Sequence, residues 1–98
     1  MLKIAVVVLN WNGEALLREF LPSVVDNSEG ADIYVADNAS TDGSIAFLKQ
    51  HYPQVGIIEN ASNGGYAKGY NDALSKIKAD IYCLLNSDVA VTKDWLVP

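Results

Sequence analysis

The sequence predicts an α/β fold in which a parallel sheet is covered by helices on both faces, and two features carry this prediction. Short apolar runs alternate along the chain with longer segments whose apolar residues recur at helical spacing. The first run, residues 4–9, has no polar residue and is rich in valine, as is typical of a strand buried on both faces. We therefore expect about four strands alternating with three helices in one domain over residues 1–98.

The four strands are expected where β-branched and other apolar residues cluster. The first and the last run contain no charged residue, and the second, I-Y-V-A, is entered through Asp32. These strands are expected at residues 4–9, 33–36, 55–58 and 81–85.

Three helices are expected between the strands, at residues 14–26, 44–52 and 65–78. Pro22 lies within the first pattern and has no backbone N–H, so we expect a kink or a break there. Asp42 and the glycine after it are interpreted as the start of the second helix. A further helix is expected to begin at Thr92 or Lys93.

The composition excludes several classes of protein. The chain has 98 residues and a formal net charge of −5, and its few lysines and arginines are scattered, which argues against nucleic acid as a partner. Residues 4–9 are too short for a signal peptide, and no run approaches the roughly 20 apolar residues of a membrane span. Cys83, interpreted as an inert buried thiol, is the single cysteine, which fits a reducing compartment, and we expect a cytoplasmic protein.

Polar residues follow each expected strand directly. In a parallel sheet the carboxyl ends of the strands meet at one edge, where ligands bind in open α/β folds. Helix capping needs one such residue per turn, and these turns carry two or three. The sequence therefore predicts a ligand site at this edge. The clusters are N-W-N-G at 10–13, D-N-A-S at 37–40, E-N at 59–60 with N-G-G at 63–65, and N-S-D at 86–88.

The residue types favour a nucleotide diphosphate with a bridging metal. Neither a P-loop motif nor G-x-G-x-x-G occurs in the sequence. The glycines at 64 and 65 open a helix, however, and such a turn accepts an anion through backbone N–H groups. Lys68 could add a positive charge, and Asp88 could hold a divalent cation.

Four motifs together resemble the family 2 glycosyltransferases of the GT-A fold. The motifs are V-V-V-L-N-W-N-G, V-A-D-N-A-S-T-D-G-S, N-G-G-Y-A-K-G-Y-N and L-L-N-S-D-V, and they cover essentially the whole chain in order. The resemblance is strongest to the bacterial branch that includes rhamnosyltransferases and other surface-polysaccharide enzymes. It implies a Rossmann-like sheet, the N-terminal portion of a GT-A domain, which binds a nucleotide-sugar.

The resemblance also implies roles for residues near the base. Asn10, Trp11 and Asn12 would line the nucleobase pocket after the first strand. Asp37 would accept a hydrogen bond from N3–H of uracil or thymine, and Asn38 would support that loop.

A second group would surround the diphosphate. Asn63, Gly64 and Lys68 would lie near it. Asp88 matches the last aspartate of the family's D-x-D motif, which ligates Mg²⁺ or Mn²⁺. Asn86 replaces the first aspartate of that motif, so it can bond a ribose hydroxyl but brings no charge to the metal.

The chemistry that the resemblance implies is inverting transfer of a sugar from a UDP- or dTDP-linked donor to a hydroxyl of a glycan or lipid-linked saccharide. The family's general base lies well after the D-x-D position, and ten residues follow Asp88. We therefore assign no catalytic residue and expect this portion, truncated at its C-terminus, to be inactive alone. The full enzyme is expected in the cytoplasm, peripheral to the inner face of the membrane.

Two other interpretations remain open at this point. One is a non-catalytic nucleotide-binding or assembly module, and the other is a plain α/β domain whose polar strand ends cap helices. The sequence does not distinguish UDP from dTDP, and it does not identify the sugar or the acceptor. A sheet of these strands would also expose the apolar run at 81–85 at its edge, so we expect a dimer or a larger species.

Overall fold

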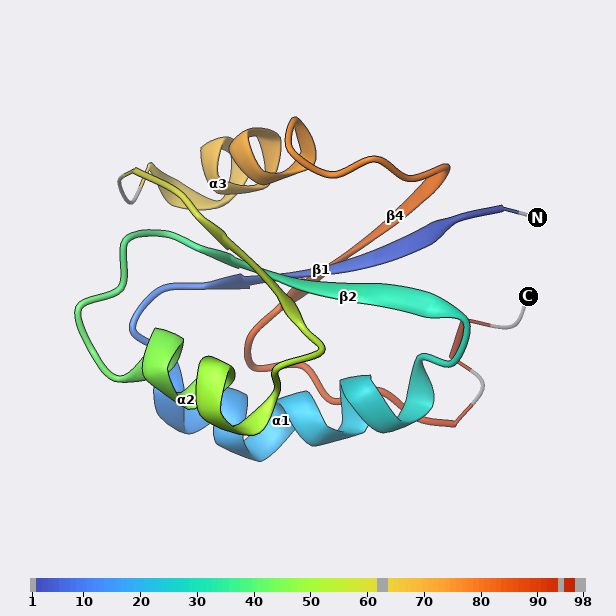
Figure 1. Ribbon diagram of the computed structural model, residues 1–98, viewed down its shortest axis with the longest axis horizontal. Coiled ribbons are helices and arrows are strands. Elements are labelled where there is room, and N and C mark those ends of the chain that lie inside the picture. The colour runs from blue at the N-terminus through green and yellow to red at the C-terminus, as the bar shows by residue number, and fades with distance from the viewer. Residues whose placement is uncertain (1, 62–63, 94, 97–98) are drawn as a thin grey trace.

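The computed structural model describes residues 2–61, 64–93 and 95–96. Strands and helices alternate along this part of the chain, as the sequence predicts (Figure 1). The elements are β1 (Ile4–Asn10), α1 (Glu14–Asn27), β2 (Ala31–Asp37), α2 (Ser44–His51), β3 (Gly56–Glu59), α3 (Gly65–Leu74) and β4 (Ile81–Asn86).

The four strands form one parallel sheet in the order β3-β2-β1-β4. Strand β1 lies between β2 and β4, with Ile4 opposite both Ala31 and Ile81. From β1 the chain proceeds to β2 and β3 on one side, then returns to place β4 on the other side. The order of the strands therefore reverses between β1 and β4, which is where open α/β sheets bind ligands.

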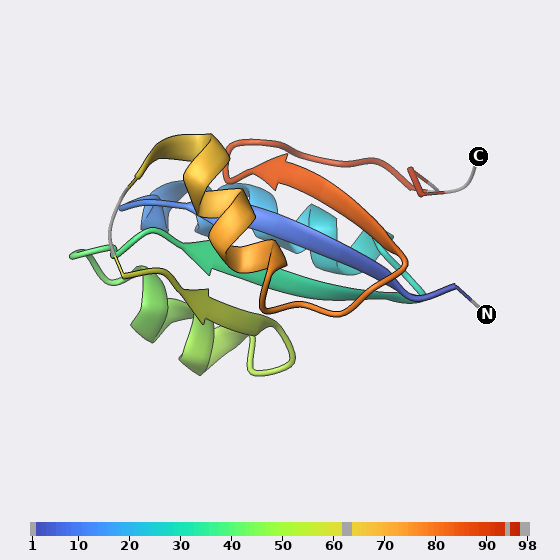
Figure 2. The ribbon, with the colours of Figure 1, turned by 90° about the horizontal axis from the view of Figure 1, so that it is seen from above.

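Helices cover both faces of the sheet. On one face α1 and α2 pack over β1 through alternate residues that include Val6 and Val8, whereas α3 covers the other face over Ala5, Val7 and Leu9 (Figures 1 and 2). All five of these residues are at most 6% exposed. The continuous apolar run of β1 is thus explained by burial on both faces.

Helix α1 continues through Pro22, so of the kink or break expected there, the break does not occur. Pro22 cannot donate to the carbonyl of Arg18, and one helical hydrogen bond is missing. Leu21 and Val24, on either side of Pro22, are each 2% exposed in the core. Their burial keeps the helix on the sheet despite the missing bond.

Two of the expected helical segments end earlier or do not form. Helix α3 ends at Leu74 instead of residue 78, although Ile77 beyond it is still buried. Residues 92–93 and 95–96 form a turn instead of the expected helix, with the Trp95 N–H bonded to the Thr92 carbonyl at 3.3 Å. In the described part of the chain no helix has both the length and the apolar character needed to cross a bilayer.

Strand β4 is an edge strand with apolar side chains in solvent. Ile81 is 40% exposed, Tyr82 37% and Leu84 45%, which agrees with the exposed edge expected from the sequence. No strand among the described residues pairs with its outer side. Cys83 is a free thiol that is half-buried against the core, so the expectation of a fully buried thiol is wrong.

Candidate functional site

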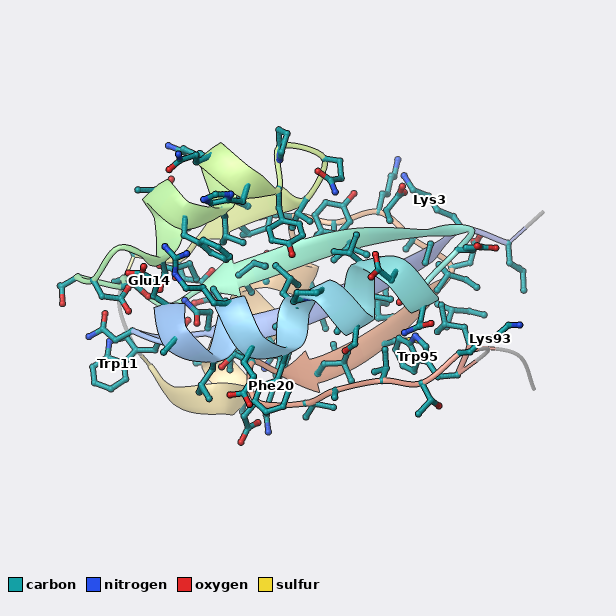
Figure 3. The ribbon with its side chains drawn as sticks, turned by 90° about the horizontal axis from the view of Figure 1, so that it is seen from below. Lys3, Trp11, Glu14, Phe20, Lys93 and Trp95 are labelled. Atoms are coloured by element: carbon teal, nitrogen blue, oxygen red, sulfur yellow. The ribbon has the colours of Figure 1, made fainter. Side chains whose placement is uncertain are left out.

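The carboxyl ends of the strands bring the polar clusters to one edge of the sheet. In the strand register Asn10 lies beside Asp37, and Asp37 lies beside Glu59. Asn86 lies beside Leu9, one residue before the end of β1. Figure 3 shows Trp11 at this edge, whereas Trp95 and Lys3 lie at the opposite end of the sheet.

The Asp37 carboxylate is the centre of a buried hydrogen-bond network. Asp37 is 2% exposed, and its Oδ1 accepts from Asn10 Nδ2 at 2.9 Å and from the Ser40 hydroxyl at 2.7 Å. Its Oδ2 accepts from the Ser40 backbone N–H at 2.8 Å. Oδ1 therefore links the loop after β2 to the end of β1, and Oδ2 fixes the turn of that loop at Ser40.

Asn12 joins the same two loops at the surface. Its Oδ1 accepts from the backbone N–H groups of Thr41 at 2.7 Å and Asp42 at 3.2 Å, and its own N–H donates to Ser40 Oγ at 2.9 Å. Its φ of 48° lies in the left-handed region, which asparagine tolerates better than most residues. The side chain of Asn12 thus acts as a bridge between loops.

Two buried asparagines connect the end of β2 to α3. Asn38 is 2% exposed and Asn60 4% exposed. Asn60 Nδ2 donates to Asn38 Oδ1 at 2.7 Å and to the Gly69 carbonyl at 3.2 Å, while Asn38 Nδ2 donates to the Gly65 carbonyl at 3.3 Å. A Cβ on Gly69 would lie 2.7 Å from Asn38 Nδ2, so this close approach requires glycine.

A pocket of about 360 Å³ opens where the strand order reverses, between the ends of β1 and β4. One wall is apolar and comes from β1, the turn after it and α1. The polar part of the lining has amide, hydroxyl and carboxylate oxygens from the end of β4, and the first residue of α3 also lines the pocket. The lining residues are Leu9, Trp11, Leu16, Gly65, Asn86, Ser87 and Asp88.

The start of α3 gives this pocket a positive end. Gly65 lines the pocket and begins the helix, with Gly64 at the N-cap position and no side-chain cap. The φ of Gly65 is 89°, which glycine adopts without strain. Because the dipole of a helix is positive at its N-terminus, this end favours an anion.

The oxygen atoms at the end of β4 fit a hard divalent cation. Asn86, Ser87 and Asp88 offer amide, hydroxyl and carboxylate oxygens, the ligands that Mg²⁺ and Mn²⁺ prefer. In the described ranges no three or more histidine, cysteine, aspartate or glutamate side chains gather in one place. A metal at Asp88 would therefore take further ligands from a bound molecule or from water.

The structure brings some of the predicted site residues together and separates others. Trp11, Asn86 and Asp88 line the pocket, and Asn10, Asp37 and Asn38 are buried at the same edge. Lys68 is outside the lining, and its ammonium pairs with Asp72 at 2.8 Å. Asn63 lies outside the described residues.

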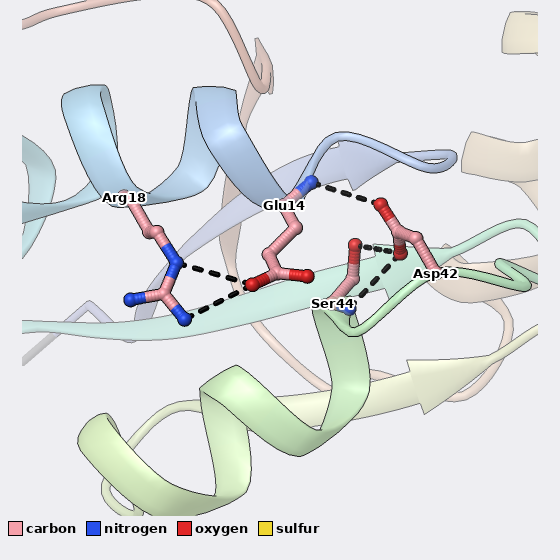
Figure 4. A network of polar contacts seen from close by, with 4 residues as sticks. All are labelled: Glu14, Arg18, Asp42 and Ser44. Atoms are coloured by element: carbon pink, nitrogen blue, oxygen red, sulfur yellow. Dashed lines mark hydrogen bonds and ion pairs between the residues drawn. The ribbon is translucent and has the colours of Figure 1, made fainter.

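A charged network fixes the first turns of α1 and α2 (Figure 4). Asp42 accepts from the Glu14 N–H at 3.1 Å and from the N–H and hydroxyl of Ser44. Burial alone would raise the pKa of Asp42, but these hydrogen bonds outweigh it and hold the pKa below its ordinary value. Asp42 therefore starts α2, as the sequence predicts, and in addition caps α1.

Several residues of this edge do not stand out in the sequence. Ser40 and Asn60 belong to the polar clusters, but their contacts depend on which strands are neighbours. Ser87 lies in the middle position of N-S-D, which the resemblance leaves without a role. Leu16 is part of the helical pattern of α1, yet it lies 38% exposed at the pocket beside the fully buried Leu17.

Comparisons with known proteins place this geometry in a family. The model of the family described as Glycosyl transferase family 2 matches residues 5–98. The poly(ribitol-phosphate) beta-glucosyltransferase of Bacillus spizizenii is 34% identical over 103 residues, covering 98% of this chain and 16% of that protein. An uncharacterized glycosyltransferase of Bacillus subtilis is 30% identical over 97 residues, covering 95% of this chain and 25% of that protein.

Solved structures share the fold. A mannosyltransferase from Pyrobaculum calidifontis, in complex with GDP-Man and Mn²⁺, has a TM-score of 0.83 at 23% identity and covers 97% of this chain and 30% of its own. Residues 1–349 of S. aureus TarS, in complex with UDP-GlcNAc, have a TM-score of 0.84 at 24% identity, over 96% of this chain and 29% of theirs. This chain thus spans a third or less of the length of these proteins. Because the family model matches residues 5–98, this chain belongs to glycosyl transferase family 2.

Proposed function

We propose that this chain is the donor-binding portion of an inverting glycosyltransferase and that it holds the nucleotide diphosphate of the donor in the pocket between β1 and β4. The observation that carries the proposal is the composition of that pocket. The apolar side chains of Leu9, Trp11 and Leu16 share the pocket with the carboxylate of Asp88 and with Gly65 at the N-terminus of α3. The apolar side chains suit a nucleoside, the carboxylate suits a metal ion, and the helix N-terminus suits a phosphate.

In this proposal the nucleoside lies along the end of β1. The exposed ring of Trp11 offers a stacking surface for a flat base or a sugar. Asp37 accepts three hydrogen bonds, and since a carboxylate has about four acceptor positions, one is left for N3–H of uracil or thymine. Because Asp37 is 2% exposed, this contact requires that Ser40 moves aside.

The diphosphate lies between α3 and Asp88 in this proposal. The N-terminal turn of α3 at Gly64 and Gly65 binds the phosphate oxygens, together with Asn63. Lys68 reaches the diphosphate when it releases Asp72. Mg²⁺ or Mn²⁺, when bound, neutralises the leaving diphosphate, and Asp88 is the protein's anionic ligand for it. Asn86 contributes a neutral amide oxygen beside it.

The complexes of the structural relatives support this choice of ligand. The TarS structure contains UDP-GlcNAc, and the mannosyltransferase structure contains GDP-Man with Mn²⁺. A nucleotide-sugar with a divalent metal is therefore the ligand class proposed for this pocket. UDP and dTDP are both retained as the nucleotide because both bases carry the N3–H donor.

The transfer step itself needs a general base and an acceptor site, and we assign neither to a described residue. An inverting transfer requires a general base that takes the proton of the acceptor hydroxyl. Because the relatives are at least three times longer, we propose that the base and the acceptor site belong to the part of those sequences that this chain does not match. The acceptor is proposed as a glycan or a lipid-linked saccharide, and the chain alone is proposed to bind the donor without transferring its sugar.

Isothermal titration calorimetry with UDP and with dTDP, each with and without Mn²⁺, tests the donor site. Asp88→Ala is expected to remove the metal dependence of binding, and Asp37→Ala to abolish binding because the loop after β2 loses its centre. Asp32→Ala is the matched control, because Asp32 is an exposed carboxylate at the opposite edge. A wild-type chain that binds neither nucleotide would contradict the proposal and favour strand ends that only cap helices.

The proposal includes a location and an assembly state. We propose a cytoplasmic protein, peripheral to the membrane in its full-length form, in which the half-buried thiol of Cys83 stays reduced. The exposed apolar side chains of β4 support association of two copies through that edge. A non-catalytic nucleotide-binding module is the second candidate, and it would bind the donor yet show no transfer in any longer version of the polypeptide.

A further inference from the structure

The side-chain carbonyl of Asn10 is a buried acceptor without a donor. Asn10 is 1% exposed, and among the described residues no group donates to its Oδ1. Its Nδ2 donates to Asp37 Oδ1 at 2.9 Å and to Ser40 Oγ at 3.3 Å. Since a carboxylate oxygen only accepts, Asp37 fixes the orientation of the amide and leaves Oδ1 on the opposite side. A buried acceptor in this state is destabilising until it receives a hydrogen bond.

The Ser87 hydroxyl approaches this oxygen at Gly13. A Cβ on Gly13 would be 2.5 Å from Asn10 Oδ1 and 3.2 Å from Ser87 Oγ, so both oxygens approach the same side of Gly13. No hydrogen bond joins them, because Asn10 Oδ1 has no partner among the described residues. Glycine at position 13 keeps this gap open, because any larger residue would fill it.

Ser87 belongs to the turn that carries the proposed metal ligand. It lies between Asn86 and Asp88, and the three side chains form the polar wall of the pocket. A long backbone hydrogen bond spans this turn, from the Val89 N–H to the Asn86 carbonyl at 3.3 Å. A small displacement of this turn toward β1 therefore brings the Ser87 hydroxyl to the open acceptor.

We propose that Ser87 is a positioning residue whose hydroxyl donates to Asn10 Oδ1 when a metal-bound nucleotide diphosphate draws Asp88 into the pocket. This inference rests on the proposed function, because that ligand is what moves the turn. The new hydrogen bond exists only in the closed arrangement, so it favours the closed arrangement and slows release of the ligand. It also satisfies the buried acceptor, which couples the end of β1 to the loop of β4 across Gly13.

Calorimetry with UDP and Mn²⁺ measures the contribution of Ser87. Ser87→Ala is expected to weaken binding by roughly three- to tenfold, the effect of one hydrogen bond to a buried acceptor. Ser87→Thr keeps the hydroxyl and is expected to bind within about twofold of the wild type. Ser75→Ala is the matched control, since Ser75 is an exposed serine that bonds only within its own turn.

The side-chain amide signals of Asn10 in NMR spectra give a readout that general loss of stability would not move. With UDP and Mg²⁺, which is not paramagnetic, these signals are expected to shift further in the wild type and in Ser87→Thr than in Ser87→Ala, where only the changes at Asp37 and Ser40 remain. A wild type that binds UDP while Ser87→Ala matches it in affinity and in Asn10 shift would overturn the role of Ser87 and leave the donor site standing. A wild type that binds no UDP would overturn the donor site and this role together.

Discussion

At the scale of single residues, one carboxylate can serve two helices. Asp42 Oδ2 accepts from the first N–H of α1, and Oδ1 accepts from the first N–H of α2 (Figure 4). Both helices thereby receive a negative charge at their positive ends. Glu14 adds an ion pair to Arg18 at 3.0 Å, and the Arg18 guanidinium lies 4.4 Å from the centre of the Phe47 ring on α2.

The lowered pKa of Asp42 predicts how stability changes with acid. A carboxyl whose pKa is lower in the folded protein than in the unfolded chain stabilises the fold above the unfolded value, here near 3.8. That contribution is lost as the pH falls through the folded pKa. In Asp42→Asn we therefore expect lower stability at neutral pH and a smaller loss between about pH 5 and pH 2.

Urea unfolding followed by circular dichroism at several pH values provides the measurement. Asp32→Asn is the control, because Asp32 is exposed and its ion pair with Lys3 spans 3.9 Å. Parallel acid profiles for the wild type and Asp42→Asn would show that the two helix ends do not depend on this charge.

At the scale of elements, apolar patterning predicts what a segment becomes but not always where it ends. The expected strands lie within two residues of the observed ones, because β-branched runs and polar strand ends set their limits locally. Helix α3 stops at Leu74, where the Ser75 hydroxyl and the following N–H groups turn back onto the helix. Ile77 stays in the core without being helical, and periodicity alone cannot separate these two cases.

Helix α1 shows that a proline in the sequence likewise does not by itself predict where a helix ends. The missing bond to the Arg18 carbonyl is a local cost, and the burial of Leu17, Leu21 and Val24 is a tertiary gain that outweighs it. We predict that Pro22→Ala raises the free energy of unfolding by about 2 kcal/mol, the helical gain reduced by the greater freedom of the unfolded chain. Thermal or urea unfolding measures this change.

Pro53→Ala is the control for that substitution, since Pro53 lies in the exposed turn before β3. At Pro53 the greater freedom of the unfolded chain is expected to lower the free energy of unfolding by about 1 kcal/mol or less. A similar loss in Pro22→Ala would mean that α1 gains nothing from the restored N–H.

The polar edge also separates what sequence can and cannot predict. That Asn10, Asp37 and Asn86 reach one edge follows from alternation of strands and helices alone. That Asp37 is enclosed by Asn10 and Ser40 depends on the register of β1 against β2 and on the shape of the loop. Side-chain enclosure of this kind is set by three-dimensional neighbours, which a single sequence does not specify.

At the scale of the whole molecule, the described sheet has two edge strands, β3 and β4, and β4 exposes large apolar side chains. Strand β4 leaves Ile81, Tyr82 and Leu84 in solvent along an unpaired edge, a surface that favours pairing with another chain. We predict that the wild type sediments as a dimer or a larger species and that Leu84→Lys shifts it toward monomer, because a charge at an edge opposes pairing.

Analytical ultracentrifugation over a range of concentrations makes this measurement. Leu2→Lys is the matched control, since Leu2 is also an exposed leucine, 63% in solvent, but lies outside the strands. A wild type that stays monomeric at high concentration would contradict association through β4.

The two tryptophans lie at opposite ends of the sheet (Figure 3). Trp11 is 55% exposed at the pocket, whereas the Trp95 indole donates to Ser28 Oγ at 2.9 Å and packs against the core. The two tryptophans are therefore intrinsic fluorophores in separate environments. Emission from Trp11 reports events at the pocket, and emission from Trp95 reports the integrity of the fold, so iodide quenching can distinguish ligand binding from unfolding without any attached dye.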